Sequence, residues 1–328
     1  MKLPFSFDFR FVFRLLLPGF ISSLGLLPII QPIASHPVLS NMVSVESIFF
    51  VTVLIMGWLF IVLDMHIYMF FEGRRYWPSF LKKPRVRSQE KRLEKIKRRL
   101  KETNDELERA ELHQKRRCFP INKEKGDYHT PYPTRLGNLI TSYEIYPKER
   151  YGMDSVFYWY RIWLSLDKDV REEIDGKQAL VDSTIYVSAS CILLSLLFFV
   201  YGIVKLCDTK LIVTSLSAGN FFFLSLISLA CSYLMYLSSL ELHIAYGETF
   251  KAMFDMHREE VNKVVDGIAK EIGKITGSEI DDKTWKEKYN IVWSYLQYYR
   301  VKNEKDEFVF PWELENSQIA KSPNNCLD

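Results

Sequence analysis

Four long stretches of this chain contain no charged residue, and they come in two pairs separated by a strongly charged middle. The stretches are Leu15 to Val45, Ser47 to Leu63, Ser183 to Val204 and Leu211 to Leu240. A helix needs roughly 20 apolar residues to cross about 30 Å of hydrocarbon, and each stretch reaches that length alone or with its flanks. Because backbone amides in lipid must bond within their own segment, each stretch is predicted to be a helix. The expected fold is therefore a mostly all-α integral membrane protein with four transmembrane helices in two hairpins.

The first of these spans is interrupted by residues that break helices. They are Pro18, Gly19, Gly25 and Pro28. We interpret the segment as a kinked span rather than a re-entrant segment. A cleaved signal peptide is disfavoured, because Arg10 and Arg14 follow mainly apolar residues and no convincing small-x-small cleavage site is present.

The placement of charge predicts the topology. The segment from Glu72 to Cys118 holds 17 basic and 8 acidic residues, whereas the loop Gln31 to Val45 holds none of either. By the positive-inside bias, the middle of the chain is cytoplasmic and that loop is external. Both termini are then cytoplasmic, in a multi-pass protein of the cell (inner) membrane. The short loop Lys205 to Lys210 carries two lysines on the opposite side, but it is too short to outweigh the rest.

These assignments divide the chain into five parts. We expect a first transmembrane hairpin over 1–71, a basic cytoplasmic insert over 72–181, a second hairpin over 182–240, a cytoplasmic helical tail over 241–316 and a disordered end over 317–328. The tail from 246 to 328 holds 12 basic and 16 acidic residues, so its net charge is opposite to that of the insert. The insert and the tail are therefore predicted to pack as one domain.

Within the insert, the segment 90–117 predicts a helix that resembles a coiled coil. Its apolar positions follow a three-four spacing and form one stripe. They are Leu93, Ile96, Leu100, Thr103, Leu107 and Ala110. A helix packed on its own domain and a contact between subunits explain this stripe equally well.

A basic cluster follows the second span directly. It comprises Arg74, Arg75, Lys82, Lys83, Arg85 and Arg87, with Tyr76 and Trp77 between them. Such a cluster can simply hold the orientation of the span. It can also bind anionic lipid headgroups, which is the partner we predict for it. Direct binding of nucleic acid is the least favoured alternative, although a basic patch alone does not distinguish polyanions.

A second set of charged residues lies among aromatic residues between Pro131 and Trp163, and after the fourth span. We predict that a structural network couples the insert to the helix that leaves this span, through Arg135, Asn138, Glu144, Arg150, Tyr151, Asp154, Asp255, His257 and Arg258. Carboxylates and arginines in such sets more often hold loops together than perform catalysis. The helical pattern continues past Leu240 to Val265, so movement of the cytoplasmic part could reach the spans.

Motifs of known catalytic chemistry are missing. No phosphate-binding glycine loop, G-x-S-x-G, H-E-x-x-H or paired metal-ligand spacing occurs. The five cysteines are scattered and form no C-x-x-C pair, so neither a zinc site nor a disulfide framework is expected. Asp64 and His66 are the polar residues at the inner end of the second span, and an ionisable residue there is a functional candidate by default. We expect no enzyme activity, no cofactor and no metal.

Small residues in the second hairpin predict close helix packing and a homo-oligomer. They are Ser188, Ser190, Ser195 and Gly202 in the third span, and Ser215, Ser217, Gly219, Ser225 and Ser228 in the fourth. Such residues let helix backbones approach closely, either between subunits or within a single bundle.

Three strings in the chain are similar to motifs of a known kind of protein. They are Arg135-Leu136-Gly137-Asn138, Tyr146-Pro147-x-x-Arg150-Tyr151-Gly152-x-Asp154, and Tyr246-Gly247-Glu248 with Phe254-Asp255-x-His257-Arg258. They resemble motifs of uncharacterised prokaryotic four-span membrane proteins. The layout alone also resembles the bestrophin channels and the membrane effectors of prokaryotic antiviral systems, including the toxic partners encoded beside some short Argonautes. In such a system a cytoplasmic sensor complex engages the basic domain and the spans permeabilise the membrane.

The sequence thus predicts a non-enzymatic membrane effector or pore that is gated by its cytoplasmic domain. The resemblance in layout implies that it is the membrane-depolarising part of an antiviral system. The uncharged spans argue against a coupled transporter. Two alternatives remain open at this point: an anchor or scaffold that recruits a cytoplasmic partner, and an ion channel like a bestrophin. An enzyme acting on lipid at the inner leaflet is less favoured.

Overall fold

The computed structural model describes residues 11–34, 44–122, 126–207, 216–276, 280, 282–302 and 308–309, and these are mostly helical. The predicted disordered end and most of the predicted outer loop lie outside this part of the chain. Two compact units divide the structure. Unit 1 contains Met1–Cys118, Thr130–Ile140 and Glu172–Tyr246, and unit 2 contains Phe119–His129, Thr141–Arg171 and Gly247–Asp328.

Three helices are long and apolar enough to cross a membrane. They are α5 (Val45–Val62), α12 (Lys168–Leu206) and α13 (Ala218–Thr276). The first predicted span is instead a series of short helices: η1 (Val12–Leu16), α2 (Leu17–Leu24) and α3 (Leu27–Ala34). The break at Gly25 and Leu26 has a local cause, because the ring of Pro28 cannot donate the backbone hydrogen bond that would continue the helix. At this break the Gly25 carbonyl accepts a bond from the Tyr201 hydroxyl at 2.7 Å.

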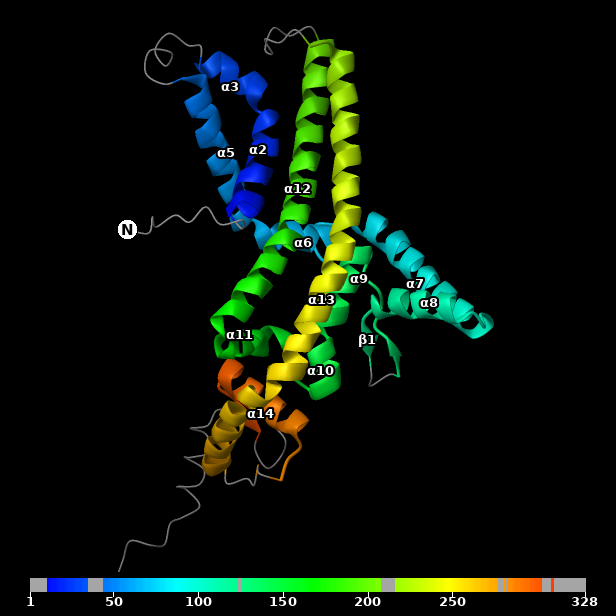
Figure 1. The fold of residues 1–328 in the computed structure, drawn as a ribbon, viewed down its shortest axis with the longest axis vertical. Helices are drawn as coiled ribbons and strands as arrows, with labels where there is room; N and C mark the ends of the chain where they lie inside the picture. The colour runs from blue at the N-terminus through cyan, green and yellow to red at the C-terminus, as the bar shows by residue number, and fades with distance from the viewer. Residues whose placement is uncertain are drawn as a thin grey trace, which may run out of the picture. The chain divides into compact units, whose positions relative to one another are not determined.

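Two glycines allow the first hairpin to pack closely within unit 1, where α2 lies beside α5 (Figure 1). A Cβ atom on Gly57 would collide with the carbonyl oxygen of Leu15, and one on Gly19 would collide with that of Val53. Backbone therefore meets backbone at this crossing. Small residues at helix crossings are a recognised way to pack spans in lipid, where the hydrophobic effect between helices is absent.

Serine pairs join the apolar parts of α12 and α13, which run side by side in unit 1 (Figure 1). The Ser188 and Ser232 hydroxyls lie 3.0 Å apart, and so do those of Ser195 and Ser225. The two pairs are seven residues apart on each helix, which is about two helical turns. Ser190 also donates to the Pro18 carbonyl at 3.1 Å. These small residues are thus buried in contacts within one chain, and self-association stays a prediction.

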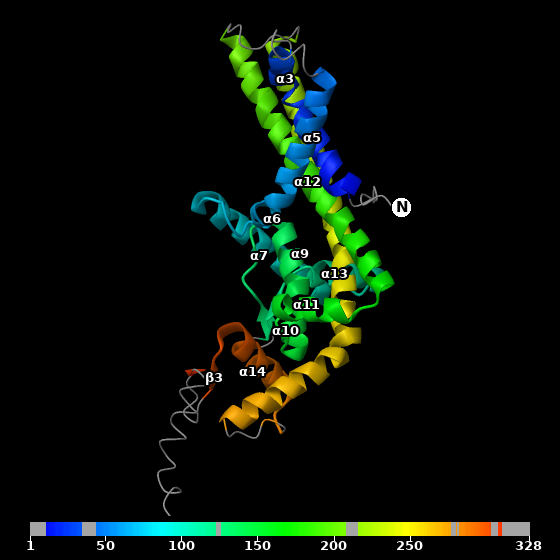
Figure 2. The ribbon, with the colours of Figure 1, turned by 90° about the vertical axis from the view of Figure 1, so that its left-hand side faces the viewer.

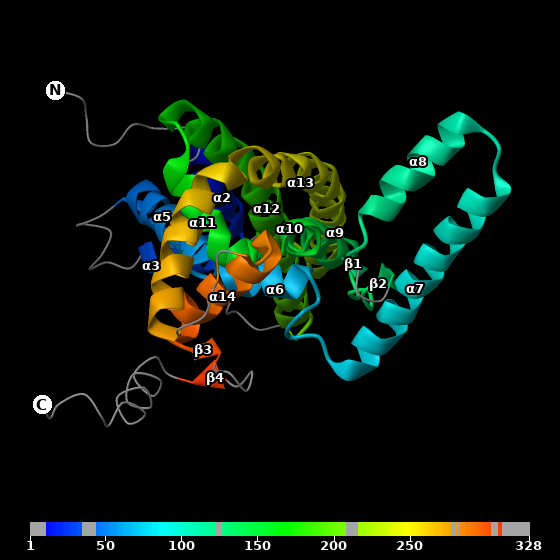
Figure 3. The same ribbon diagram turned by 90° about the horizontal axis from the view of Figure 1, so that it is seen from below.

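The rest of unit 1 follows the second span. Helix α6 (Asp64–Phe71) leads through a turn to α7 (Ser79–Glu102) and α8 (Glu106–Arg117), which form a hairpin (Figure 3). The single helix predicted over 90–117 is thus two helices. The break follows from local chemistry, because Asp105 caps α8 by accepting the Leu107 amide at 3.1 Å. Leu93 and Ile96 are buried as the stripe predicts, whereas Leu107 is exposed.

Unit 2 is a small helical body with two short hairpins of strands. It contains β1 (Ile121–Asn122) paired with β2 (Asp127–Tyr128), then α10 (Tyr146–Tyr151), α11 (Ser155–Ser165), α14 (Trp285–Tyr298), and β3 (Val301–Lys302) paired with β4 (Phe308–Val309). The end of α13 belongs to it as well, because this helix continues past Leu240 as predicted. Figure 2 labels its helices α10, α11 and α14. Its core is aromatic: the Trp159 ring stacks on Phe250 at 4.7 Å, and the buried Tyr158 meets Tyr289.

The close packing at Gly57 predicts that alanine substitutions at two glycines change the stability in opposite directions. Gly57→Ala should destabilise the protein by roughly 1 to 3 kcal/mol, because its methyl group has no room beside the Leu15 carbonyl. Gly176→Ala in α12 should instead stabilise it by up to about 1 kcal/mol, since nothing lies within 4 Å of the added atom and alanine favours a helix. Thermal unfolding of the detergent-solubilised variants measures both. A shift of the same sign in the two variants would contradict the crossing.

Candidate functional site

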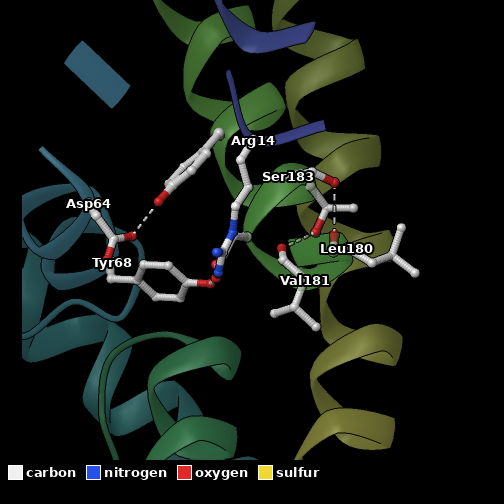
Figure 4. A network of polar contacts seen from close by, with 9 residues as sticks. Arg14, Asp64, Tyr68, Leu180, Val181 and Ser183 are labelled. Carbon is white, nitrogen blue, oxygen red and sulfur yellow. Dashed lines mark hydrogen bonds and ion pairs between the residues drawn. The ribbon is translucent and has the colours of Figure 1, made fainter. Parts of the chain in front are cut away.

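A polar network lies in unit 1 at the ends of the uncharged stretches (Figure 4). Arg14 on η1 forms an ion pair with Asp182 on α12 through its Nη2 and the Oδ2 of the aspartate. The Tyr68 hydroxyl on α6 donates to the other carboxylate oxygen, Oδ1, at 2.6 Å. Asp182 therefore receives a cation from one element and a neutral donor from another. These partners are 168 and 114 residues away in the sequence.

A second tyrosine–aspartate bond joins the same two helices, with the aspartate on α6 and the tyrosine on α12. Asp64 on α6 accepts a bond from the Tyr186 hydroxyl on α12 at 2.7 Å. Each helix thus offers one aspartate and, four residues later, one tyrosine, and residues at that spacing share a helix face. Helices α6 and α12 are joined by two reciprocal tyrosine–aspartate bonds. Arg14 adds a positive charge to one of the two carboxylates.

Burial makes the ion pair consequential. The Asp182 side chain is 9% exposed and the Arg14 side chain is 29% exposed. Moving a carboxylate out of water costs several kcal/mol, and the attraction of a partner offsets this only when further hydrogen bonds satisfy its oxygens. Both Asp182 oxygens have such partners. The pair is therefore stable only as a complete set, and loss of either member leaves a charge in a poor environment.

A buried histidine adjoins the network on α13. His243 is 1% exposed, and its ring lies edge-on to Tyr68 with the centroids 6.0 Å apart. Its Nδ1 lies 2.7 Å from the Ser239 carbonyl, so Nδ1 carries the hydrogen and donates it. The Nε2 atom has no hydrogen-bond partner among the described residues. His243 is thus a neutral acceptor within the bundle.

The network consists of paired charges and tyrosine hydroxyls. Within the described part of the chain, no group of three or more histidine, cysteine, aspartate or glutamate residues is placed to hold a metal ion. The network pairs acids with a cation and with tyrosines, and it contains no nucleophile beside a base. What it can do is hold η1, α6 and α12 together in one arrangement and release them when a charge is lost.

The basic cluster predicted to bind lipid lies in unit 1. Arg74 bonds to Glu72 at 2.5 Å, and its guanidinium lies 5.2 Å from the centre of the Tyr132 ring. Lys82, Lys83, Arg85 and Arg87 lie on α7, where their spacing distributes them around the helix axis rather than along one face. Arg75 is exposed in the preceding turn. Lipid binding by this cluster stays a prediction.

The residues predicted to couple the insert and the tail fall in both units. Arg135 and Asn138 belong to unit 1, where the Asn138 side chain bonds to the backbone of Tyr132 and Thr134 and shapes the turn before α9 (Arg135–Glu144). Glu144, Arg150 and Asp154 belong to unit 2. Asp154 accepts the Phe157 amide at 2.9 Å and caps α11.

The remaining members of that set meet in unit 2, mainly through tyrosines. Asp255 accepts the Tyr146 hydroxyl at 2.9 Å and the Tyr151 hydroxyl at 2.5 Å. The Arg258 guanidinium lies 4.6 Å from the centre of the Tyr151 ring. His257 lies 3.5 Å from Glu260. These contacts are exposed, so their contribution to stability is small.

The other predicted pair, Asp64 and His66, does not act together. Asp64 joins the network described above, whereas the exposed His66 has its Nδ1 2.7 Å from the Tyr76 hydroxyl. No role was predicted for Asp182, Tyr68 or Tyr186 from the sequence, and Arg14 entered only as an argument against a signal peptide. One signal could have found the pair: Arg14 and Asp182 each immediately precede an uncharged stretch, so they lie at corresponding ends of two spans.

Comparisons with protein-family models, with curated proteins and with solved structures found no match for this chain. The residues themselves therefore carry the functional argument.

The ion pair generates a prediction for stability. Arg14→Ala and Asp182→Ala should each destabilise the detergent-solubilised protein by roughly 3 to 5 kcal/mol, because each leaves a buried charge without its partner. The double variant should lose much less than the sum of the two, since it removes both charges. Thermal or denaturant unfolding of the four proteins gives this coupling, and additive effects would show that the two side chains do not interact.

The tyrosine core of unit 2 generates a prediction for pH. The Tyr158 hydroxyl donates to the Tyr289 carbonyl at 2.8 Å, and the Tyr289 hydroxyl donates to Asn262. Burial raises the pKa of Tyr158, and it raises the pKa of Tyr289 to about 12. A free tyrosine loses its proton at about pH 10. As the pH rises, the two tyrosines therefore ionise in the unfolded chain before they ionise in the folded protein, and this ionisation favours unfolding. The melting temperature should fall as pH increases from about 10 to 12, and Tyr158→Phe should weaken this dependence.

Proposed function

We propose that the protein is a non-enzymatic membrane effector whose cytoplasmic domain controls a passive pathway through its spans. The observation that carries this proposal is the buried ion pair of Arg14 and Asp182, closed by the Tyr68 hydroxyl. In this proposal the protein is a multi-pass protein of the inner membrane with both termini in the cytoplasm, and a released state depolarises the membrane. Such a role agrees with the layout of membrane effectors in antiviral systems.

The ion pair supports a switch for a physical reason. Ionisable residues within membrane segments are costly, and they most often mark functional sites. A buried pair has two distinct states, because its members are stable together and unfavourable apart. Three elements separated widely in the sequence meet at this pair, so its opening would free η1 and α6 from α12. The ends of the spans beside Arg14 and Asp182 would then separate.

Helix α13 supplies the connection to the cytoplasmic part. It runs without a break from Ala218 to Thr276, so its first residues belong to unit 1 and its last residues to unit 2. Within unit 1 it carries His243, whose ring meets Tyr68 of the network. We propose that a partner bound to the cytoplasmic part rotates or displaces this helix. The movement would disturb Tyr68 and weaken the hydrogen bond to Asp182.

The proposal predicts leakage when the ion pair is broken. Cells that express Asp182→Asn should lose membrane potential without any trigger, because the neutral amide no longer attracts Arg14 and the closed arrangement is weakened by a few kcal/mol. A potential-sensitive dye measures this in cells, with equal membrane insertion confirmed by fractionation. Arg14→Lys, which keeps the charge, should leak less than Arg14→Gln.

A matched control lies on the same helix. Glu173 forms an exposed pair with Lys177 at 2.8 Å, so Glu173→Gln removes a carboxylate of α12 outside the network. It should leave the potential as in the wild type. If Asp182→Asn, Arg14→Gln and strongly overexpressed wild type all insert and leave the dye unchanged, the spans form no passive pathway. The protein would then be an anchor for a cytoplasmic partner.

A further inference from the structure

A cavity of about 630 Å³ lies in unit 1, away from the ion pair. Elements from several parts of the chain form its walls: the end of α6, one face of α7, the start of α9, and the facing parts of α12 and α13. Its size is within the range of ligand sites in proteins, which is roughly 300 to 1,000 Å³. The cavity has two kinds of wall, and each kind points to one part of a ligand.

One wall is cationic. Arg85, Arg92 and Arg135 line it, and no aspartate or glutamate is among the described residues that line the cavity. Arg92 and Arg135 both line the cavity, so two positive groups share this space, and burial together with the nearby Arg135 guanidinium lowers the pKa of Arg92. An anion between them would relieve their repulsion. Guanidinium groups bind phosphate through paired hydrogen bonds, so phosphate is the anion that three arginines favour.

The part of the lining that comes from α12 and α13 is mainly apolar, although Ser188 and Ser232 also contribute to it. Ile192 of α12 and Leu229 of α13 lie within the uncharged stretches, so they lie at the depth of the hydrocarbon. Trp77 and Tyr236 also line the cavity. Tyrosine and tryptophan concentrate at the boundary between hydrocarbon and headgroups. The cavity therefore offers cationic, aromatic and apolar side chains to one ligand.

A buried amide provides an independent sign of a ligand. Gln89 is 8% exposed and lines the cavity, and its Oε1 atom has no hydrogen-bond partner among the described residues. It lies on the same face of α7 as Arg85 and Arg92, because the three follow a spacing of four and three residues. A buried polar atom without a partner is unfavourable. A hydroxyl group on a lipid headgroup could donate to this oxygen while the phosphate binds the arginines.

We propose that this cavity binds one anionic phospholipid with a hydroxyl-bearing headgroup. The phosphate contacts Arg92 and Arg135, a headgroup hydroxyl donates to Gln89, and an acyl chain lies along Ile192 and Leu229. The site differs from the exposed basic cluster, of which it includes only Arg85. Lipid binding here does not depend on whether the spans conduct, so its failure and that of the proposed function are separate results.

The test uses the full chain in detergent with added phosphatidylglycerol, phosphatidylcholine or inorganic phosphate. Phosphatidylglycerol should raise the melting temperature, and the other two should not, because one lacks net charge and the other lacks a chain. Native mass spectrometry should show one retained phosphatidylglycerol. In Arg92→Ala/Arg135→Ala the affinity should fall by about 30-fold, since each basic contact with an anionic lipid is worth about a factor of five.

Three further variants separate the cavity from its alternatives. Lys91→Ala/Lys95→Ala removes two exposed charges of α7 that belong neither to the basic cluster nor to the cavity lining, and it should bind as the wild type does. Ile192→Trp keeps every arginine but fills the apolar end, and it should lose binding while its melting temperature without lipid confirms that it folds. Gln89→Leu should reduce the preference for phosphatidylglycerol over phosphatidic acid. If the lysine variant loses binding and the cavity variants keep it, or if inorganic phosphate stabilises as well as the lipid does, the cavity is not a lipid site.

Discussion

A carboxylate inside a bundle of apolar helices needs a cation and hydrogen-bond donors, and this requirement organises unit 1. Asp182 interrupts the apolar side of α12 just before its uncharged stretch. Its two oxygens are satisfied by Arg14 and Tyr68, which come from elements far away in the sequence. Because each donor must reach the same carboxylate, the position of η1 and α6 against α12 is fixed more narrowly than apolar packing alone would fix it.

Beyond this pair, the spans associate through short contacts of small residues. Ser188 and Ser195 bond to serines of α13. The backbone of Leu15 packs directly against Gly57, which has no side chain to keep it away. Hydroxyl bonds between helices are worth little individually in lipid, commonly below about 1 kcal/mol. Their contribution is geometric, because only one register brings both serine pairs together. The charged network and the serine pairs thus determine the arrangement by different means.

The sequence predicts the helices better than it predicts their meeting points. Hydropathy alone indicates α5, α12 and α13, because length without charge is a property of each segment by itself. The break between α7 and α8 was missed, since the capping of α8 by Asp105 overrides a helical pattern that continues across it. The candidate site could not be predicted from single segments. Which charges meet depends on the depth and rotation of each helix, and the pairing of Asp64 with Tyr186 leaves no local trace.

Several residues of the three motifs that resemble those of prokaryotic membrane proteins have structural roles. Their presence in the motifs therefore needs no functional explanation. Gly152 adopts φ of +82° and ends α10, and Asp154 begins α11. The arginines divide in a similar way. Arg14 forms an ion pair with a carboxylate within its own bundle, whereas Arg85, Arg92 and Arg135 line a cavity. At the membrane surface a positive charge can be balanced either by the protein or by lipid. Arg14 is therefore balanced within the protein, and the proposed lipid would supply the phosphate for Arg92 and Arg135.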